Sequence, residues 1–243
     1  MSVCDDSMRI DFSGDRVLAV VAHPDDAELL CAGTLARARD DGAAIGVCIL
    51  CRGDKGQPLR PIPNLPAVRR KEARAASKLL RAELYFGEFA DGTLSDGTPQ
   101  RLKMIEVYRL FRPTLVLAHS VEDYHPDHRA AAAIAEAASW FCASRGYKTR
   151  SPSLGAQPAV WFMDTLNMNG FTPEFYIDVS PYASLKDQML LCHGSQLQRK
   201  SDKAFSPLGD VMRRQYETRG QQCGVAAAEA FRAHDAYKRS RAW

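Results

Sequence analysis

The stretch VLAVVAHPDDAELLCAGTLA, residues 17–36, decides how the chain folds. Its apolar beginning, up to Ala22, is rich in valine and has the length of a buried strand. The six residues HPDDAE follow at once and place an imidazole and three carboxylates at the end of that strand. Apolar side chains then recur near helical spacing as far as Gly42, which is a helix stop signal. The stretch therefore predicts a strand, a charged turn and a helix over 26–42.

The same alternation of strand and helix continues along the first half of the chain. Further strand-like runs lie at 44–51, 83–87 and 114–118, and helical patterns lie at 67–82, 99–111 and 129–141. This β-α-β order predicts an α/β protein with a doubly wound, mostly parallel, Rossmann-like sheet and helices on both faces. Because no stretch reads as a linker, we expect a single domain over residues 1–243.

The second half of the chain is less regular. PAVWFMDTL (158–166) and EFYIDVS (174–180) have the composition of strands, and PYASLKDQMLLCHGSQ (181–196) has that of a helix running into a polar turn. A mobile loop is expected over 144–158, where Gly and Pro interrupt a polar segment. The polar and basic C-terminal region, 201–243, is expected to form helix and loop covering the sheet edge.

Composition narrows the class of protein. Of the 243 residues, 46% are hydrophobic and 25% are charged, and the formal net charge is +3. This balance is ordinary for a globular chain and does not indicate a nucleic-acid partner. No apolar run approaches the roughly 18 residues of a membrane-spanning helix, and the N-terminus lacks the apolar core of a signal peptide. The seven cysteines follow no disulfide pattern, so we expect a reduced, cytoplasmic protein without a membrane partner.

Four of the six histidines lie in two turns that each contain the tripeptide His-Pro-Asp. The first turn is AHPDDAE, and the second is HSVEDYHPDH, residues 119–128. Proline favours the first helical position, so each Asp enters a first turn, where the helix dipole favours negative charge. The first and fourth strands of a doubly wound sheet are typically neighbours where the strand order reverses and a crevice opens. We therefore expect both turns to meet in one pocket.

Imidazoles and carboxylates that converge in one pocket are typical of a divalent metal site. Without a cation, the carboxylates of Asp25, Asp26 and Asp127 would repel one another and their pKa values would rise. A zinc ion would stabilise them and lower the pKa of a water to roughly 7. Three protein ligands would leave one position open, which is the arrangement of a catalytic site.

The two turns resemble the signature motifs of the LmbE/PIG-L family of zinc-dependent N-acetylglucosamine deacetylases, which includes the deacetylases of mycothiol and bacillithiol biosynthesis. Further matches, in the same order, are CRGDKG, RRKEARAASKLL, FADGTL and HGSQ, so the resemblance covers roughly residues 15–200. It implies a hydrolase that removes an N-acetyl or similar N-acyl group from an amino sugar or its glycoside.

The resemblance also implies a role for each residue of the two turns. The implied ligands of zinc, or of another divalent metal such as Fe²⁺, are His23, Asp26 and His128. Asp25 would be the general base that takes a proton from the attacking water. His125 would donate to the developing oxyanion, and Asp127 would orient and charge His125.

Four residues outside the turns are expected to bind the substrate: Arg52, Arg69 and Asp91 resemble sugar-recognition positions of the family, and His193 lies in a motif, HGSQ, that resembles one lining the site. A surface ion pair would equally explain Arg69, and a turn position would explain Asp91. His119, at the end of the fourth strand, is expected to support the site without binding the metal. The expected partner is a small N-acylated amino-sugar conjugate. The acyl group, the aglycone and homo-oligomerisation are left open by the sequence.

Two other functions fit the same residues. Two histidines and one aspartate also hold Fe(II) in oxygenases, but that triad is usual on a β-barrel and leaves Asp25 and His125 without a task. A non-catalytic sugar- or nucleotide-binding protein would keep the fold, yet it would have no need of Asp25. The sequence thus favours the deacetylase, with the binding protein as the alternative.

Overall fold

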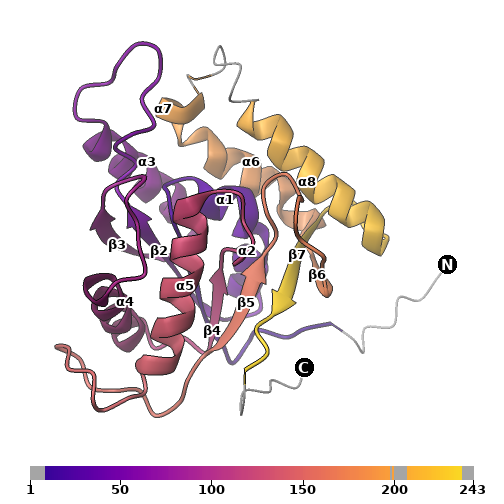
Figure 1. Ribbon diagram of the computed structural model, residues 1–243. Coiled ribbons are helices and arrows are strands. Elements are labelled where there is room, and N and C mark those ends of the chain that lie inside the picture. Colours follow the sequence, from indigo (N-terminus) through magenta and orange to yellow (C-terminus); the bar gives the residue numbers. More distant parts are fainter. Residues whose placement is uncertain (1–8, 198, 200–206, 237–243) are drawn as a thin grey trace.

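The computed structural model describes residues 9–197, 199 and 207–236 and confirms the doubly wound α/β fold (Figure 1). In this part of the chain seven strands form one sheet, in the order β3-β2-β1-β4-β5-β7-β6. The strands are β1 Arg16–Val21, β2 Ala44–Cys51, β3 Glu83–Phe89, β4 Leu115–Ala118, β5 Ala159–Met163, β6 Phe175–Asp178 and β7 Ala228–Ala233. Strands β3, β2, β1, β4 and β5 are parallel, whereas β7 runs antiparallel to both β5 and β6.

Helices cover both faces of this sheet (Figure 1). Their bounds are α1 Asp26–Leu30, α2 Ala32–Asp40, α3 Leu65–Leu80, α4 Thr98–Phe111, α5 Pro126–Phe141, α6 Ala183–Leu191, α7 Gly194–Leu197 and α8 Leu208–Cys223. Helices α4 and α5 pack in one apolar core, and α1, α2, α3, α6 and α8 pack in the other. No helix within the described residues is long and apolar enough to cross a membrane.

Strand β1 is buried on both faces, which explains its unbroken apolar run. Val17 and Val21 face the core under α1 and α2, and Leu18 and Val20 face the core under α4 and α5. Strand β1 pairs with β2 on one side and with β4 on the other. The strand order therefore reverses between β1 and β4, as the sequence predicts, and the crevice at their carboxyl ends is the place where a doubly wound sheet binds its ligand.

The helix expected over 26–42 is split at Cys31 into α1 and α2. The break frees the backbone N–H groups of Gly33 and Thr34, and both donate to the carboxylate of Glu229, at 3.0 and 2.7 Å. Since Glu229 lies on β7, far away in the sequence, a local pattern gives no sign of this break.

The expectation for the C-terminal region is wrong in one respect. Helix α8 is present, but β7 does not cover the sheet edge: it inserts between β5 and β6. Its sequence AEAFRA has no β-branched residue and one aromatic residue, so strand propensity gives only a weak signal there. Pairing with two strands determines its conformation. Residues 201–206 and 237–243 lie outside the described part.

The segment 144–158 contains no regular element, as expected, but it is anchored. The buried guanidinium of Arg109 donates to the carbonyl oxygens of Ser144, Tyr147 and Ser151 at 2.8–3.3 Å. These contacts indicate a fixed loop in place of the mobile one predicted.

Candidate active site

The two His-Pro-Asp turns meet at the carboxyl ends of β1 and β4, as the sequence predicts. The ring centroids of His23 and His128 lie 5.5 Å apart, and those of His125 and His128 lie 4.7 Å apart. His119, fully buried, stacks on His128 at 4.0 Å. Turns that are distant in the sequence therefore place four imidazoles together.

Asp26 lies at the centre of these imidazoles. Its Oδ2 atom is 3.5 Å from His23 Nδ1, 3.3 Å from His119 Nε2 and 3.5 Å from His128 Nε2. The backbone N–H of His23 donates to the same oxygen at 2.7 Å. Burial alone would raise the pKa of Asp26, but His128 and the other two imidazoles hold it well below its usual value. Asp26 is therefore a carboxylate surrounded by imidazole nitrogens.

Asp25 has a strained backbone conformation, and its side chain contacts an arginine. Its φ of 105° lies in the left-handed region, which is costly for a residue with a side chain and recurs at functional sites. Arg69 Nη2 lies 3.0 Å from Asp25 Oδ2 and also donates to the carbonyl oxygen of Pro24. Burial raises the pKa of Asp25, and Arg69 opposes that rise. The carboxylate is thus fixed, buried and more basic than a surface aspartate.

Asp127 contacts a different histidine from the one expected. Its Oδ2 is 3.0 Å from His23 Nε2 and accepts the backbone N–H of Gly92 at 2.7 Å. His125 Nδ1 instead accepts the backbone N–H of Asp127, at 3.1 Å. The proton of a neutral His125 ring therefore lies on Nε2. Burial, together with the charges of His128 and His23, lowers the pKa of His125. Asp127 thus orients His23 and leaves His125 an uncharged donor.

Asp123 orients the second turn, a role that sequence reasoning missed. Its Oδ1 is 3.1 Å from His128 Nδ1 and accepts the backbone N–H of His125 at 2.9 Å. Burial would raise the pKa of Asp123, but His128 lowers it. An Asp two residues before a His-Pro-Asp motif was the available signal, since carboxylates commonly orient ligating histidines.

The charges of the cluster show whether a cation fits. Burial lowers the pKa of His23, but Asp127 and Asp26 raise it to about 10. Burial also lowers the pKa of His128, yet Asp26 and Asp123 raise it to about 9. The carboxylates thus require positive charge at this place, and two imidazole protons supply it. A divalent cation would displace those protons with the same charge, so the donor set fits zinc.

Two overlapping groups of side chains have ligand atoms within 4.8 Å of one another: His23, His125 and His128, and also Asp26, His119 and His128. The predicted ligands His23, Asp26 and His128 draw on both groups. A third group joins His23 to Cys51 and Asp91. These are the groupings found among the described residues, and His128 is shared by the two that lie between the turns.

A cavity of about 320 Å³ opens over the cluster. Eight of the ten predicted site residues line it: His23, Asp25, Asp26, Arg69, Asp91, His125, Asp127 and His128. Further lining residues outside the predicted set include Lys55, Tyr124, Leu166, Gln196, Arg199 and Leu208. The cavity thus has a floor of acid and imidazole groups and a wall that includes three cationic side chains.

Arg52 and His193 do not line this cavity. Arg52 is exposed, pairs with Asp54 at 3.5 Å and borders a separate small hollow. His193 is fully buried, and its Nε2 lies 3.4 Å from Glu28 Oε1. The role of both residues in substrate binding stays a prediction.

Asp91 supports the loop that follows β2. Its carboxylate accepts the backbone N–H groups of Gly53 and Lys55, at 2.8 and 3.1 Å. Gly53 has φ of 73°, and a Cβ there would lie 2.5 Å from Arg69 Cδ. Glycine is therefore required where this loop passes over Arg69, and Asp91 holds the loop against the cavity.

A doubly wound sheet with acids and imidazoles at its switch point defines an α/β enzyme. The chain belongs to the PIG-L family, whose profile, described as GlcNAc-PI de-N-acetylase, matches residues 18–139.

Three individual proteins extend this comparison. The 4-oxalmesaconate hydratase of Pseudomonas putida is 27% identical over 188 residues, which are 74% of this chain and 73% of that protein. The structure of a conserved protein from Thermus thermophilus is 30% identical with a TM-score of 0.78, covering 94% of this chain and all of that one. The N,N′-diacetylchitobiose deacetylase of Pyrococcus horikoshii shares the fold, with 21% identity and a TM-score of 0.79 over 90% of this chain and 84% of that one.

Proposed function

We propose that the protein is a zinc-dependent hydrolase that removes an N-acetyl or similar N-acyl group from an amino sugar or its glycoside. The observation that carries this proposal is the fixed, buried Asp25 carboxylate beside the Asp26 and imidazole cluster, at the floor of a cavity. A family of de-N-acetylases and a deacetylase of the same fold support the same chemistry.

In this proposal His23, Asp26 and His128 hold the cation, which when bound makes a water nucleophilic near neutral pH and polarises an amide carbonyl. Asp25 takes a proton from the attacking water and returns it to the leaving amine. Its raised pKa suits a group that must both accept and release a proton. His125 Nε2–H donates to the oxygen on which negative charge develops.

Three positioning residues complete the proposed mechanism. Arg69 keeps Asp25 in place through its contact with Asp25 Oδ2. Asp127 orients His23, and Asp123 orients His128, through contacts of 3.0 and 3.1 Å. These contacts fix the imidazole rings before a substrate arrives, which lowers the reorganisation needed during the reaction.

A second candidate is the addition of water to an unsaturated carboxylate. The hydratase of Pseudomonas putida favours it because the similarity covers about three quarters of both chains. The cavity wall also carries Lys55 and Arg199, whose charges suit a carboxylate substrate. Both candidates use an activated water and a base, so the same floor of the cavity would serve either reaction.

One assay separates these functions. The zinc-loaded protein is incubated with a panel of N-acetylglucosamine glycosides, with and without a chelator, and acetate and free amine are measured. The proposal predicts acetate and amine in equal amounts, abolished by the chelator and restored by zinc. A parallel incubation with 4-oxalmesaconate is followed by the loss of its ultraviolet absorbance. Hydration without acetate release would establish the second candidate. If neither reaction occurs, calorimetric binding of a glycoside would support the non-catalytic alternative.

A further inference from the structure

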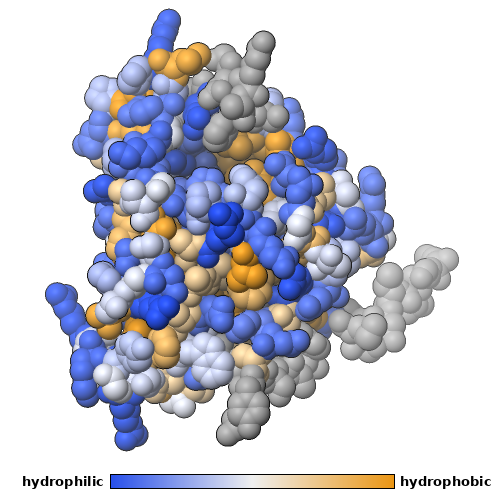
Figure 2. Space-filling view, in the orientation of Figure 1, coloured by the Kyte–Doolittle hydropathy of each residue, from blue (hydrophilic) through white to orange (hydrophobic). Residues whose placement is uncertain are grey.

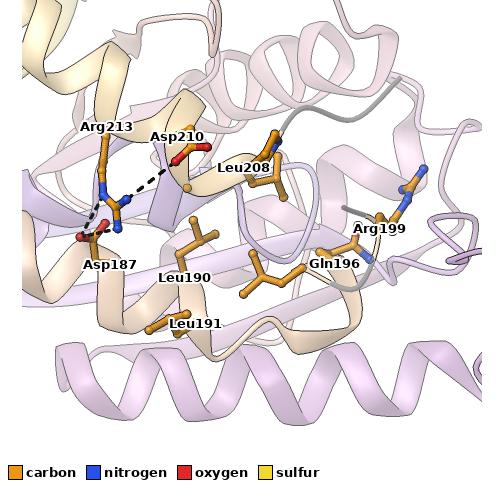
Figure 3. Close-up of a pocket in the computed structure, with 11 residues that line it drawn as sticks. Asp187, Leu190, Leu191, Gln196, Arg199, Leu208, Asp210 and Arg213 are labelled. Atoms are coloured by element: carbon orange, nitrogen blue, oxygen red, sulfur yellow. Dashed lines mark hydrogen bonds and ion pairs between the residues drawn. The ribbon is translucent and has the colours of Figure 1, made fainter. Parts of the chain in front are cut away.

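A second pocket, of about 330 Å³, lies between α6, α7 and the start of α8 (Figure 3). Its wall includes four leucines, Leu190, Leu191, Leu197 and Leu208, together with Pro207. We name it the leucine pocket. A space of this volume is large enough to bury a small organic group.

The leucine pocket adjoins the cavity over the imidazole cluster and shares part of its lining. Gln196, Arg199 and Leu208 line both spaces. Gln196 is buried, and its Nε2 donates to the carbonyl oxygen of Gly56 at 3.2 Å. This contact ties α7 to the loop that borders the cavity, so Gln196 is held at the boundary between the two spaces.

The two ends of the leucine pocket are polar and its middle is apolar (Figure 3). Gln196 and Arg199 lie at the end that the cavity shares, and Arg213 lies at the other end with Asp187 and Asp210, at 3.1 and 3.8 Å. Leu191 is 69% exposed to solvent. A ligand that covers it would remove apolar surface from water, which favours binding.

The surroundings argue for a small occupant that arrives from the cavity. The face shown in Figure 2 is hydrophilic over most of its area, and its apolar residues lie in several separate areas. The leucine pocket is instead a hollow with walls on α6, α7 and α8, and it lies next to the cavity. A group attached to the substrate would reach it without leaving the protein surface.

We propose that the leucine pocket binds an apolar alkyl or aryl group of the substrate while its amide lies over the imidazole cluster. This inference rests on the proposed function and narrows it: the substrate is an amino sugar that carries a hydrocarbon group, either as its acyl chain or as its aglycone. Burial of each additional methylene contributes about fourfold to binding.

The test compares kcat/KM along two series of substrates. One series contains methyl, butyl and octyl glycosides of N-acetylglucosamine, and the other contains N-acetyl, N-butanoyl and N-octanoyl glucosamine. The measured quantity is the ratio of kcat/KM between the longest and the shortest member, so each protein serves as its own reference. A rise in the first series assigns the aglycone to the pocket, and a rise in the second assigns the acyl chain.

Two variants change the pocket and one serves as a matched control. Leu191→Glu places a charge on an exposed part of the wall, which is compatible with folding. Gly209→Phe adds bulk at a lining position where a Cβ meets nothing within 4 Å. Leu110→Glu is the control, because Leu110 is 54% exposed on α4, which covers the other face of the sheet.

In one of the two series, kcat/KM for the longest substrate should exceed that for the shortest by at least tenfold in the wild type and in Leu110→Glu. The same ratio should be near one in Leu191→Glu and Gly209→Phe. No dependence on chain length in the wild type, or an equal dependence in all four proteins, would overturn the proposal. If even the methyl glycoside is not deacetylated, the proposed function fails separately. Calorimetric titration of the octyl glycoside into the wild type and Leu191→Glu then tests whether the leucine pocket binds the alkyl chain. Equal dissociation constants reject this role, and weaker binding to the variant supports it.

Discussion

Two groups of buried charged residues adjoin α1, and they differ in what their charges contact. Lys186 and Glu229 are 1% and 4% exposed and form an ion pair. The Lys186 ammonium also donates to two backbone carbonyls of α1, and the Glu229 carboxylate accepts two backbone N–H groups of α2. The pair therefore has its hydrogen bonds satisfied within the protein, and it joins α6, β7 and the break between α1 and α2.

The cluster around Asp26 is also buried, but it faces a cavity. Asp26 and Asp127 lie against His23 and His128, whose pKa values they and Asp123 raise, and Asp25 pairs with Arg69 and carries a left-handed backbone. Removing one partner of a closed pair destabilises a fold, whereas an open cluster with a strained backbone and shifted pKa values is typical of a functional site. The comparison predicts that changes in the first group affect stability and changes in the second affect chemistry.

The largest effect on chemistry is expected from Asp25→Asn. Asparagine tolerates the left-handed backbone and keeps the size of the side chain, but it cannot accept the proton. We expect kcat to fall by about 10²–10⁴-fold, with little change in metal content and in the melting temperature. Steady-state kinetics, elemental analysis and thermal unfolding measure these three quantities. Asp96→Asn, in a surface ion pair with Arg101, is the control, and an active Asp25→Asn enzyme would show that another group is the base.

The largest effect on stability is expected from Lys186→Met. The change leaves the buried Glu229 carboxylate without its counter-charge, which costs about 3–5 kcal/mol of unfolding free energy. Urea unfolding measures this loss, and Lys71→Met, at an exposed position of α3, is the control. Replacing Glu229 with Gln in the same protein should restore part of the stability. A double variant no more stable than Lys186→Met would show that the two charges do not interact.

A smaller, pH-dependent effect is expected in the metal-free protein. The pKa values of His23 and His128 are raised to about 10 and about 9 in the folded chain. Their contribution is complete below the unfolded pKa, roughly 6.5, and is lost as the pH rises through the folded values. Unfolding free energy should therefore fall by more than about 1 kcal/mol between pH 6.5 and 8.5. Urea unfolding with chelator measures it, and His23→Gln should flatten the slope.

The smallest effect is expected from Arg52→Ala. Arg52 is exposed and lies outside the cavity wall, so we expect kcat/KM to change by less than about threefold, within the range of a surface substitution. Arg69→Met, which removes the partner of Asp25, should lower kcat much more. A large loss of kcat/KM in Arg52→Ala would support its predicted role in substrate binding.

Sequence alone predicts most of the first half of the fold and the centre of the site. The apolar run of β1 is buried on both faces, and the two His-Pro-Asp turns lie at strand ends. These local patterns are enough to predict that His23 and His128 lie close together. Hydrophobic periodicity and the position of proline can be recognised in one short stretch of sequence. The strand order follows from the succession of such stretches along the chain.

The rest depends on contacts between distant residues. The break at Cys31 exists because Glu229 accepts N–H groups from α2, and β7 forms because two other strands pair with it. Sequence also could not decide which histidine Asp127 contacts, since His23 and His125 both lie near it once the chain is folded. Pairing of this kind is determined by tertiary structure and not by motif spacing.

The central claim is that the two turns share one cation. The most direct test is the zinc content of the purified protein by elemental analysis, for the wild type, His23→Ala, His128→Ala and the control His234→Ala, whose ring pairs with Glu136 away from the cavity. The account predicts one zinc per chain in the wild type and the control, and a severe loss of zinc in each of the other two variants. Full zinc content in either His23→Ala or His128→Ala would contradict it.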